Sequence, residues 1–190
     1  MAIDIFREVG YARASMAMIS ARIGGSKGTL YGYFKSKEAL FAAAMMAVME
    51  KQADELMALL DLSEPNVSLA LRRFGEALLA LLTSADTLAI MRAAIAEGAN
   101  STLGAILYEM GAGRAWEQMT NYIARQQENG VIRPVDARVA AAHLKGLIEI
   151  GFIEPLLFGA QPWFTPKEAV ATAVDVFLRA YGSGSNDGGQ

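Results

Sequence analysis

Positive charge and hydroxyl groups are concentrated in one short stretch near the N-terminus, GGSKGTLYGYFKSK, which covers residues 24–37. Lysine and hydroxyl side chains bind phosphate oxygens, and lysine also donates to guanine edges. Glycine lets a backbone approach a base or a phosphate closely, and the N–H groups at a helix start bind phosphate. The stretch therefore has the chemistry of a site for a polyanion. The residues that we expect to contact it are Ser15, Ser26, Lys27, Gly28, Thr29, Tyr31, Tyr33 and Lys37.

The charge of the chain is unevenly distributed around this stretch. The 190 residues include 17 basic and 20 acidic residues, which gives a formal net charge of -3. Six of the basic and three of the acidic residues fall within residues 1–40, which leaves 11 and 17 for the rest of the chain. A solvated basic face is the plain interpretation of one such cluster. Residues 12–37 contain no acidic residue at all, however, and this polarity favours an anionic partner at the N-terminal end.

The composition argues against other kinds of site. The chain has no cysteine and a single histidine, His143, which excludes disulfides, thiolate nucleophiles and multi-histidine metal sites. No phosphate loop or dinucleotide fingerprint occurs, and an enzyme would need a catalytic group built on His143. We therefore expect no metal, no cofactor and no enzymatic activity. The longest charge-free apolar run, residues 39–49, is shorter than the about 20 residues of a membrane span, so we expect a cytoplasmic protein without a membrane partner.

Helix-forming residues and an apolar spacing of three or four predict an all-α chain. Serines 15, 26 and 36 are good N-caps, and they predict helices over residues 16–23, 27–34 and 37–60, after a first helix over residues 2–9. The capping-box sequence Thr165 to Glu168 opens a last helix over residues 166–181. Further helices are expected over residues 67–82, 87–97, 102–128 and 136–158, the third of them weakened by Gly104, Gly111 and Gly113.

The two short helices joined by a glycine turn predict a helix-turn-helix, which places its second helix in the major groove of DNA. Leu30 and Phe34 are four residues apart, so they share the face that packs inward. Lys27, Thr29 and Tyr33 lie outside that face, where they can reach a bound duplex. The expected polyanion is therefore double-stranded DNA.

The segment IFREVGYARASMAMISARIGGSKGTLYGYFKSKEALF resembles the N-terminal DNA-binding domain of TetR-family transcriptional regulators. Residue types and spacing agree at Phe6, Gly10, Tyr11, Ser15, Met16, Ile19, Gly24, 26–31, Tyr33, Phe34, Lys37, Glu38 and Leu40. The resemblance implies a helix-turn-helix domain over residues 1–43 that continues into a connecting helix, 37–60. It further implies a helical ligand-binding and dimerisation domain over residues 61–181, followed by a Gly/Ser-rich tail, 182–190, that we expect to be disordered. Residues 91–159 are similar, more weakly, to C-terminal domains of efflux and stress regulators.

The resemblance implies a small-molecule effector whose binding releases operator DNA. Aromatic residues and methionines on the C-terminal helices would suit a cavity for an apolar or aromatic effector of this kind. Ordinary core packing is the plain interpretation of most of these side chains, and a lone histidine on an apolar helix is usually structural. The candidate ligand-binding residues are Met91, Tyr108, Trp116, Met119, Tyr122, His143 and Phe152.

A homodimer is expected from the apolar content of 53% and from two helix faces near the C-terminus. Small residues that allow close helix approach and the apolar stripe of the last helix would together suit a four-helix interface. These residues are Ala140, Ala141, Ala142 and Gly146, and Val170, Val174, Phe177 and Tyr181.

One alternative to a ligand-responsive repressor stays open, a helical partner- or ligand-binding protein that has lost DNA binding. It is favoured by Gly25 and Gly32, which are smaller than the residues that the family pattern has there. Ala14 and Ser20 also depart from that pattern. The sequence starts in the middle of the family's usual first helix, without the basic arm that often precedes it.

Overall fold

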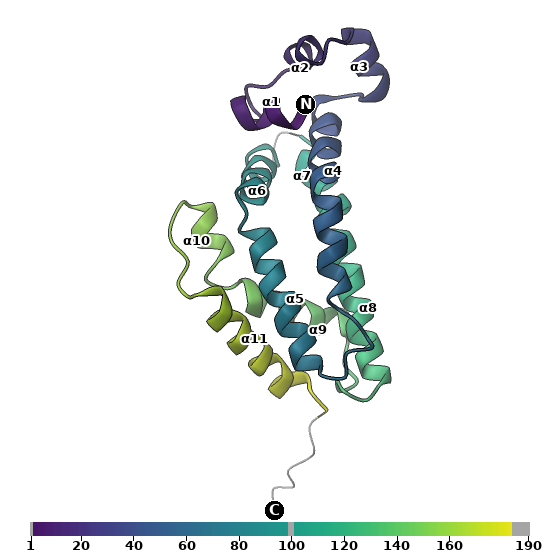
Figure 1. The fold of residues 1–190 in the computed structure, drawn as a ribbon, viewed down its shortest axis with the longest axis vertical. Helices are drawn as coiled ribbons and strands as arrows, with labels where there is room; N and C mark the ends of the chain where they lie inside the picture. Colours follow the sequence, from purple (N-terminus) through teal and green to yellow (C-terminus); the bar gives the residue numbers. More distant parts are fainter. Residues whose placement is uncertain (1, 99–100, 184–190) are drawn as a thin grey trace, which may run out of the picture. The chain divides into compact units, whose positions relative to one another are not determined.

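A computed structural model (Figure 1) describes residues 2–98 and 101–183, except for the side chains of Lys27, Met46, Val48 and Met49. The described residues form helices and no strand beyond one isolated bridge between Ile132 and Gly182, so the all-α prediction is confirmed. Residues 184–190 of the predicted tail lie outside the described part of the chain. Among the described residues no single helix is long and apolar enough to cross a membrane. Only the bent pair of consecutive helices Val67–Leu82 and Ala85–Glu97, taken together, meets that test of length and composition.

Most helices begin and end where the caps predicted. The first six are α1 (Ala2–Val9), α2 (Met16–Ile23), α3 (Lys27–Tyr33), α4 (Lys37–Ala58), α5 (Val67–Leu82) and α6 (Ala85–Glu97). The last is α11 (Pro166–Tyr181), where the Thr165 side chain accepts from the Glu168 N–H and the Glu168 side chain accepts from the Thr165 N–H. This reciprocal pair confirms the predicted capping box.

The predicted helix over residues 102–128 forms and is weakened where its glycines lie, but the expectation of one uninterrupted α-helix is wrong. The structure has α7 (Leu103–Leu107), a π-helical segment η1 (Tyr108–Gly113) and α8 (Arg114–Glu128) in unbroken succession. Glycine is a poor helix former, and three glycines fall in the first half of this segment. A Cβ at Gly113 would lie only 3.3 Å from the Tyr108 carbonyl oxygen, so the widened turn closes tightly on this glycine.

The predicted helix over residues 136–158 is also wrong, because it is divided into α9 (Ala137–Glu149) and α10 (Ile153–Leu157). The chain turns at Gly151, whose φ of 78° is left-handed and favours glycine. The Trp163 N–H donates to the Gly151 carbonyl oxygen at 3.0 Å, and a Cβ at Gly151 would lie 3.0 Å from the ring of Phe164. A later segment of the chain therefore packs on the break and fixes it.

The helices form two compact units, which do not follow the order of the chain. The first unit contains the residues up to Gln52 together with Ala89–Gly113, and the second contains Ala53–Leu88 together with the chain from Arg114 onwards. In the core of the first unit the ring of Phe41 meets the rings of Phe6 and Tyr11 edge-on, at 4.8 and 4.9 Å between centroids. Ile90 and Leu103 belong to the same buried cluster.

In the second unit α11 packs against both α5 and α9, and α8 packs against α9 (Figure 1). The apolar stripe of α11, namely Val170, Val174 and Phe177, is fully buried in this core. Ala140 and Ala141 on α9 are buried in the same cluster. The expectation that these residues form a dimer surface is therefore wrong, because an amphipathic helix covers its apolar side with its nearest neighbours in the same chain.

Candidate nucleic-acid interface

The turn between α2 and α3 is held by its own hydrogen bonds. Gly24 has a left-handed φ of 75° and closes α2, while the Ser20 hydroxyl donates to the Gly25 carbonyl oxygen at 2.7 Å. Ser20 is buried, which explains a serine at a position where the family pattern has alanine. A Cβ at Gly25 would meet no atom within 4 Å, so this glycine stands at an open position of the turn.

Ser15 and Ser26 both act as N-caps. The Ser15 hydroxyl oxygen accepts from the Met18 N–H at 3.2 Å, and the Ser26 hydroxyl oxygen accepts from the Thr29 N–H at 3.0 Å. The hydroxyls of Ser26 and Thr29 also lie 2.8 Å apart. All three residues are exposed, so these hydroxyls fix the helix starts and remain within reach of a ligand.

The outer face of α3 carries hydroxyls and glycines and no carboxylate. Tyr33 is 80% exposed and Tyr31 is 41% exposed, whereas Leu30 packs against the core of the first unit. A Cβ at Gly32 would meet nothing within 4 Å, and Gly28 faces only the Ser26 hydroxyl. The Lys27 backbone starts this helix, while its side chain lies outside the described part of the structure. A polyanion can therefore approach α3 closely without meeting a negative charge on that helix.

Lys37 has a structural role that its position in the sequence did not indicate. Its Nζ donates to the Tyr11 carbonyl oxygen at 3.1 Å and lies 4.1 Å from the centroid of the Tyr11 ring. The Tyr11 hydroxyl in turn donates to Glu38 Oε1 at 3.0 Å, and burial raises the pKa of this hydroxyl well above its ordinary value. Lys37 thereby ties the start of α4 to the segment between α1 and α2.

Two other cations near α3 are engaged within the first unit. The Arg22 guanidinium donates to both oxygens of the Glu8 carboxylate, at 3.2 and 3.0 Å, and Arg13 Nε donates to the Val9 carbonyl oxygen at 2.8 Å. Lys35 is exposed. The charge presented to a partner is therefore smaller than the count of basic residues in the sequence predicts.

The predicted ligand-binding residues do not converge on one site. Met91 and Tyr108 lie in the first unit, and the other five lie in the second. His143 is exposed on α9 and forms a hydrogen bond with the Tyr181 hydroxyl, so it does not face a cavity. This partner is the structural role that a lone histidine usually has.

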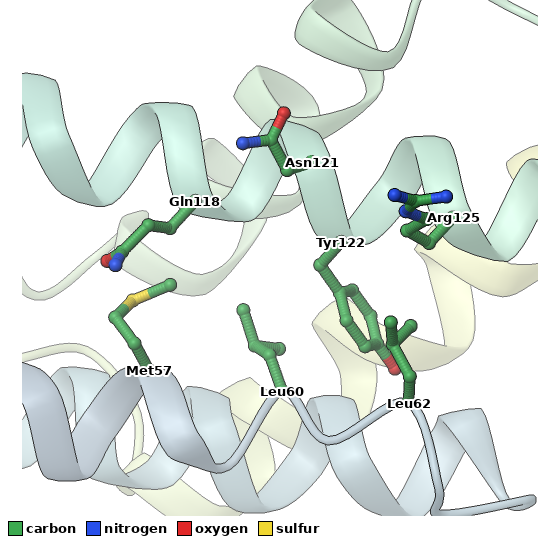
Figure 2. Close-up of a pocket in the computed structure, with 7 residues that line it drawn as sticks. All are labelled: Met57, Leu60, Leu62, Gln118, Asn121, Tyr122 and Arg125. Atoms are coloured by element: carbon green, nitrogen blue, oxygen red, sulfur yellow. The ribbon is translucent and has the colours of Figure 1, made fainter.

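The remaining candidates belong to the core of the second unit. Met119, Tyr122 and Phe152 are buried in its main cluster, and Trp116 packs against that cluster. Tyr122 also lines a pocket that has a volume of about 280 Å³ (Figure 2). The pocket is lined by Met57, Leu60, Leu62, Gln118, Asn121, Tyr122 and Arg125.

Six of these seven lining residues were not among the ligand-binding candidates predicted from the sequence; only Tyr122 was. Residues 118, 121, 122 and 125 follow the helical spacing i, i+3, i+4 and i+7, so they share one face of α8. That spacing could be read from the sequence, but three of the four residues are Gln118, Asn121 and Arg125, which are polar or charged and are not the residues expected in an apolar cavity. Among the described residues no group of three or more histidine, aspartate or glutamate side chains could hold a metal ion.

Two family models match most of the chain. Residues 1–44 match the model of bacterial regulatory proteins of the tetR family, and residues 69–183 match the C-terminal domain of AefR-like transcriptional repressors. The second match alone covers more than half of the chain. A comparison with curated proteins gives no match.

Solved structures of the same architecture span nearly the whole chain. A TetR-family regulator of Mesorhizobium loti is 25% identical, with a TM-score of 0.83 over 95% of this chain and 93% of that chain. The flavonoid-responsive regulator FrrA is 26% identical, with a TM-score of 0.76 over 95% and 93% of the two chains. SmeT in complex with triclosan is 25% identical, with a TM-score of 0.63 over 97% and 90%. The matched models and the helix-turn-helix geometry lead to one conclusion: the chain belongs to the TetR family of bacterial transcriptional regulators.

Proposed function

We propose that this regulator is a repressor, which binds operator DNA as a homodimer and leaves it when a small molecule binds to the second unit. The observation that carries the proposal is the outer face of α3, where exposed tyrosines and hydroxyls stand beside glycines and no carboxylate occurs. A DNA-binding domain over residues 1–43 and an effector and dimerisation domain over residues 61–181 belong to this proposal, as does a location in the cytoplasm, where chromosomal DNA is found.

In the bound state α3 enters the major groove, and its residues divide into two roles. Ser15, Ser26 and the N–H groups at the start of α3 bind phosphates, which fixes the position of the helix. Lys27, Thr29 and Tyr33 approach base edges, and Lys27 can donate to guanine. Lys37 and Tyr31 complete the phosphate contacts, with Lys37 also holding the segment around Tyr11 in place.

The dimer face that we propose is the outer side of α9 and α11. Val139, Ala142, His143 and Gly146 are all exposed on α9, and their spacing places them on one side of the helix, while the exposed Ile150 follows at its C-cap. Val176 on α11 is also exposed, at 43% of its surface. Small and apolar side chains along two neighbouring helices suit a four-helix interface with a second copy of the chain.

Release of DNA follows from the spacing of the two α3 helices in such a dimer. Half-sites on one face of a duplex lie about 34 Å apart, or a multiple of that distance. Because α4 contributes residues to both units, a ligand that favours another position of α4 changes this spacing. A coupling free energy of about 1–3 kcal/mol is typical, and operator DNA must then weaken effector binding by the same factor. The flavonoid response in the name of FrrA and the triclosan bound to SmeT support an aromatic effector here.

Fluorescence anisotropy with a labelled duplex from the promoter of its own gene tests the proposal. We expect salt-dependent binding, which Tyr33→Ala weakens by about tenfold if the tyrosine contacts a base edge. Lys27→Ala should relax base preference and reduce the salt slope by about one. The matched control is Tyr108→Ala, since Tyr108 is exposed on η1 and not on α3.

If both α3 variants bind like the wild type, the assignment of α3 is wrong. If the wild type binds no promoter DNA and yet binds a small molecule or a protein, the chain is the helical binding protein that the sequence left as an alternative.

A further inference from the structure

We infer that the pocket beside Tyr122 binds a small carboxylate with an aromatic or apolar body, an inference that rests on the proposed function because it specifies the effector. Three features of the pocket carry it: a buried hydroxyl without a partner, an apolar wall, and a single cationic side chain among the seven that line it.

The Tyr122 hydroxyl is a hydrogen-bond donor that the protein leaves unused. Tyr122 is only 4% exposed, and its hydroxyl makes no hydrogen bond of ordinary geometry with the described residues, although the Gln126 side chain is near enough to interact with it. Buried polar groups in native proteins are nearly always paired, so an unpaired one points to a missing partner. Figure 2 shows the side chain reaching from α8 to the segment after α4, with its hydroxyl beside Leu62. Leu62 is 48% exposed, so a ligand can displace it and reach the hydroxyl without opening the core.

The hydroxyl is fixed in its donor form. Burial raises its pKa, an interaction with the Gln126 side chain lowers it in part, and the negative charges of Asp61 and Glu64 raise it again, so that the net shift is upward. Those two carboxylates disfavour an anion that the Tyr122 hydroxyl would hold alone. The hydroxyl therefore suits one oxygen of a carboxylate whose charge is held by Arg125, one turn later on the same face of α8.

The apolar wall sets the body of the ligand. Met57, Leu60 and Leu62 line the side opposite α8 (Figure 2). The volume of about 280 Å³ lies at the lower end of the range of about 300–1,000 Å³ that ligand sites occupy. A ligand with one or a few rings, or with a short chain, fits such a space.

Arg125 sets the charge of the ligand. Its Nη1 donates to Glu128 Oε2 at 2.9 Å, but both side chains are 64% exposed, so this surface pair is weak. A guanidinium has five N–H donors in a planar fork that suits a carboxylate. The amides of Gln118 and Asn121, nearly two turns and about one turn before Arg125 on the same face of α8, supply further donors for a carboxylate.

Isothermal titration of the full chain with benzoate, in the absence of DNA, tests the assignment. Benzamide is the matched neutral probe, because it keeps the ring and the carbonyl and removes the charge. We expect benzoate to bind roughly tenfold more tightly than benzamide. Arg125→Gln should abolish this difference, and Tyr122→Phe should weaken both probes while leaving the helical circular dichroism unchanged. Arg138→Gln, an exposed arginine on α9, is the control and should change neither affinity.

Absence of a benzoate signal at millimolar concentration would overturn the inference, and so would equal benzoate affinity in the wild type and both pocket variants. Operator release is measured separately by anisotropy, so the two proposals can fail independently. Benzoate that occupies the pocket without changing operator affinity would refute the release mechanism and keep the pocket. If a neutral aromatic compound releases operator from the protein while benzoate does not bind, the release mechanism is kept and the assignment of the pocket is refuted.

Discussion

The packing of α5 against α11 gives a prediction whose sign depends on two opposed effects at Gly75. A Cβ at this position would lie 2.7 Å from Val170 Cγ1 and 3.4 Å from both Val170 Cγ2 and Ile148 Cδ1. Val170 is fully buried, and a β-branched side chain in a helix has one strongly preferred rotamer, so its methyl cannot rotate away. The added methyl in Gly75→Ala therefore forces the two helices apart.

The magnitudes decide the direction. Alanine is favoured over glycine inside a helix by roughly 0.5–1 kcal/mol, whereas overpacking a core costs typically about 1–3 kcal/mol. Gly75→Ala should therefore lower the free energy of unfolding by about 1 kcal/mol. For a chain of this length that corresponds to a fall in Tm of about 2–4 °C. Urea unfolding followed by circular dichroism, at one fixed chain concentration, measures the change.

The matched control places the same substitution in a Val170→Ala background, where the two nearest methyl groups are gone. There only the helix preference remains, so Gly75→Ala should raise the free energy of unfolding by up to about 1 kcal/mol. The sign of the effect should thus reverse between the two backgrounds. Equal effects in both would mean that Val170 does not limit the space beside Gly75, and the account of this contact would be wrong.

Three further outcomes are expected. Lys37→Met should lower the stability of the first unit by about 1–2 kcal/mol in thermal unfolding, because it removes the hydrogen bond and the ring contact with Tyr11. The pKa of Glu38 lies below its ordinary value of 4.5, because its carboxylate accepts hydrogen bonds from its own backbone N–H and from Ser36. The ionised Glu38 therefore stabilises the fold fully above pH 4.5, and this stabilisation is lost as the pH falls through the lowered pKa. Glu38→Gln should therefore lose less stability than the wild type between pH 7 and pH 3 in urea titrations. Val139→Asp should raise the dimer dissociation constant at least about tenfold in sedimentation runs, and an unchanged constant would exclude the outer side of α9 as the interface.

Helices with strong local end signals were predictable from the sequence. Ser15, Ser26 and the pair Thr165 and Glu168 each form the capping hydrogen bonds that their residue types and spacing predict. Gly24 ends α2 in the left-handed conformation for a reason that is equally local. Wherever a boundary depends on a few neighbouring residues, its position follows from the sequence alone.

The errors arise where distant segments decide. Gly151 breaks the predicted helix because Trp163 and Phe164 pack on it from a segment twelve or more residues later. The row Ala140, Ala141 and Ala142 allows close packing on every side, so composition cannot tell which alanines meet α11 and which face outward. Candidate DNA contacts could be proposed from the sequence because lysine and hydroxyl side chains are types that bind phosphate, whereas the pocket beside Tyr122 depends on where the segment after α4 folds back.

The interleaved order of the two units has a consequence for protein engineering. A simple hybrid regulator would join the N-terminal head of one protein, residues 1–44 here, to the C-terminal body of another. Its single junction would lie after residue 44, where the N-terminal family match ends. Here the core of the head includes Ile90 and Leu103, which the chain supplies only after the first helices of the body. A one-junction hybrid would therefore surround Leu40 and Phe41 with foreign side chains. A hybrid that transplants residues 89–113 together with residues 1–52 keeps that core from a single parent, at the expense of three junctions in place of one.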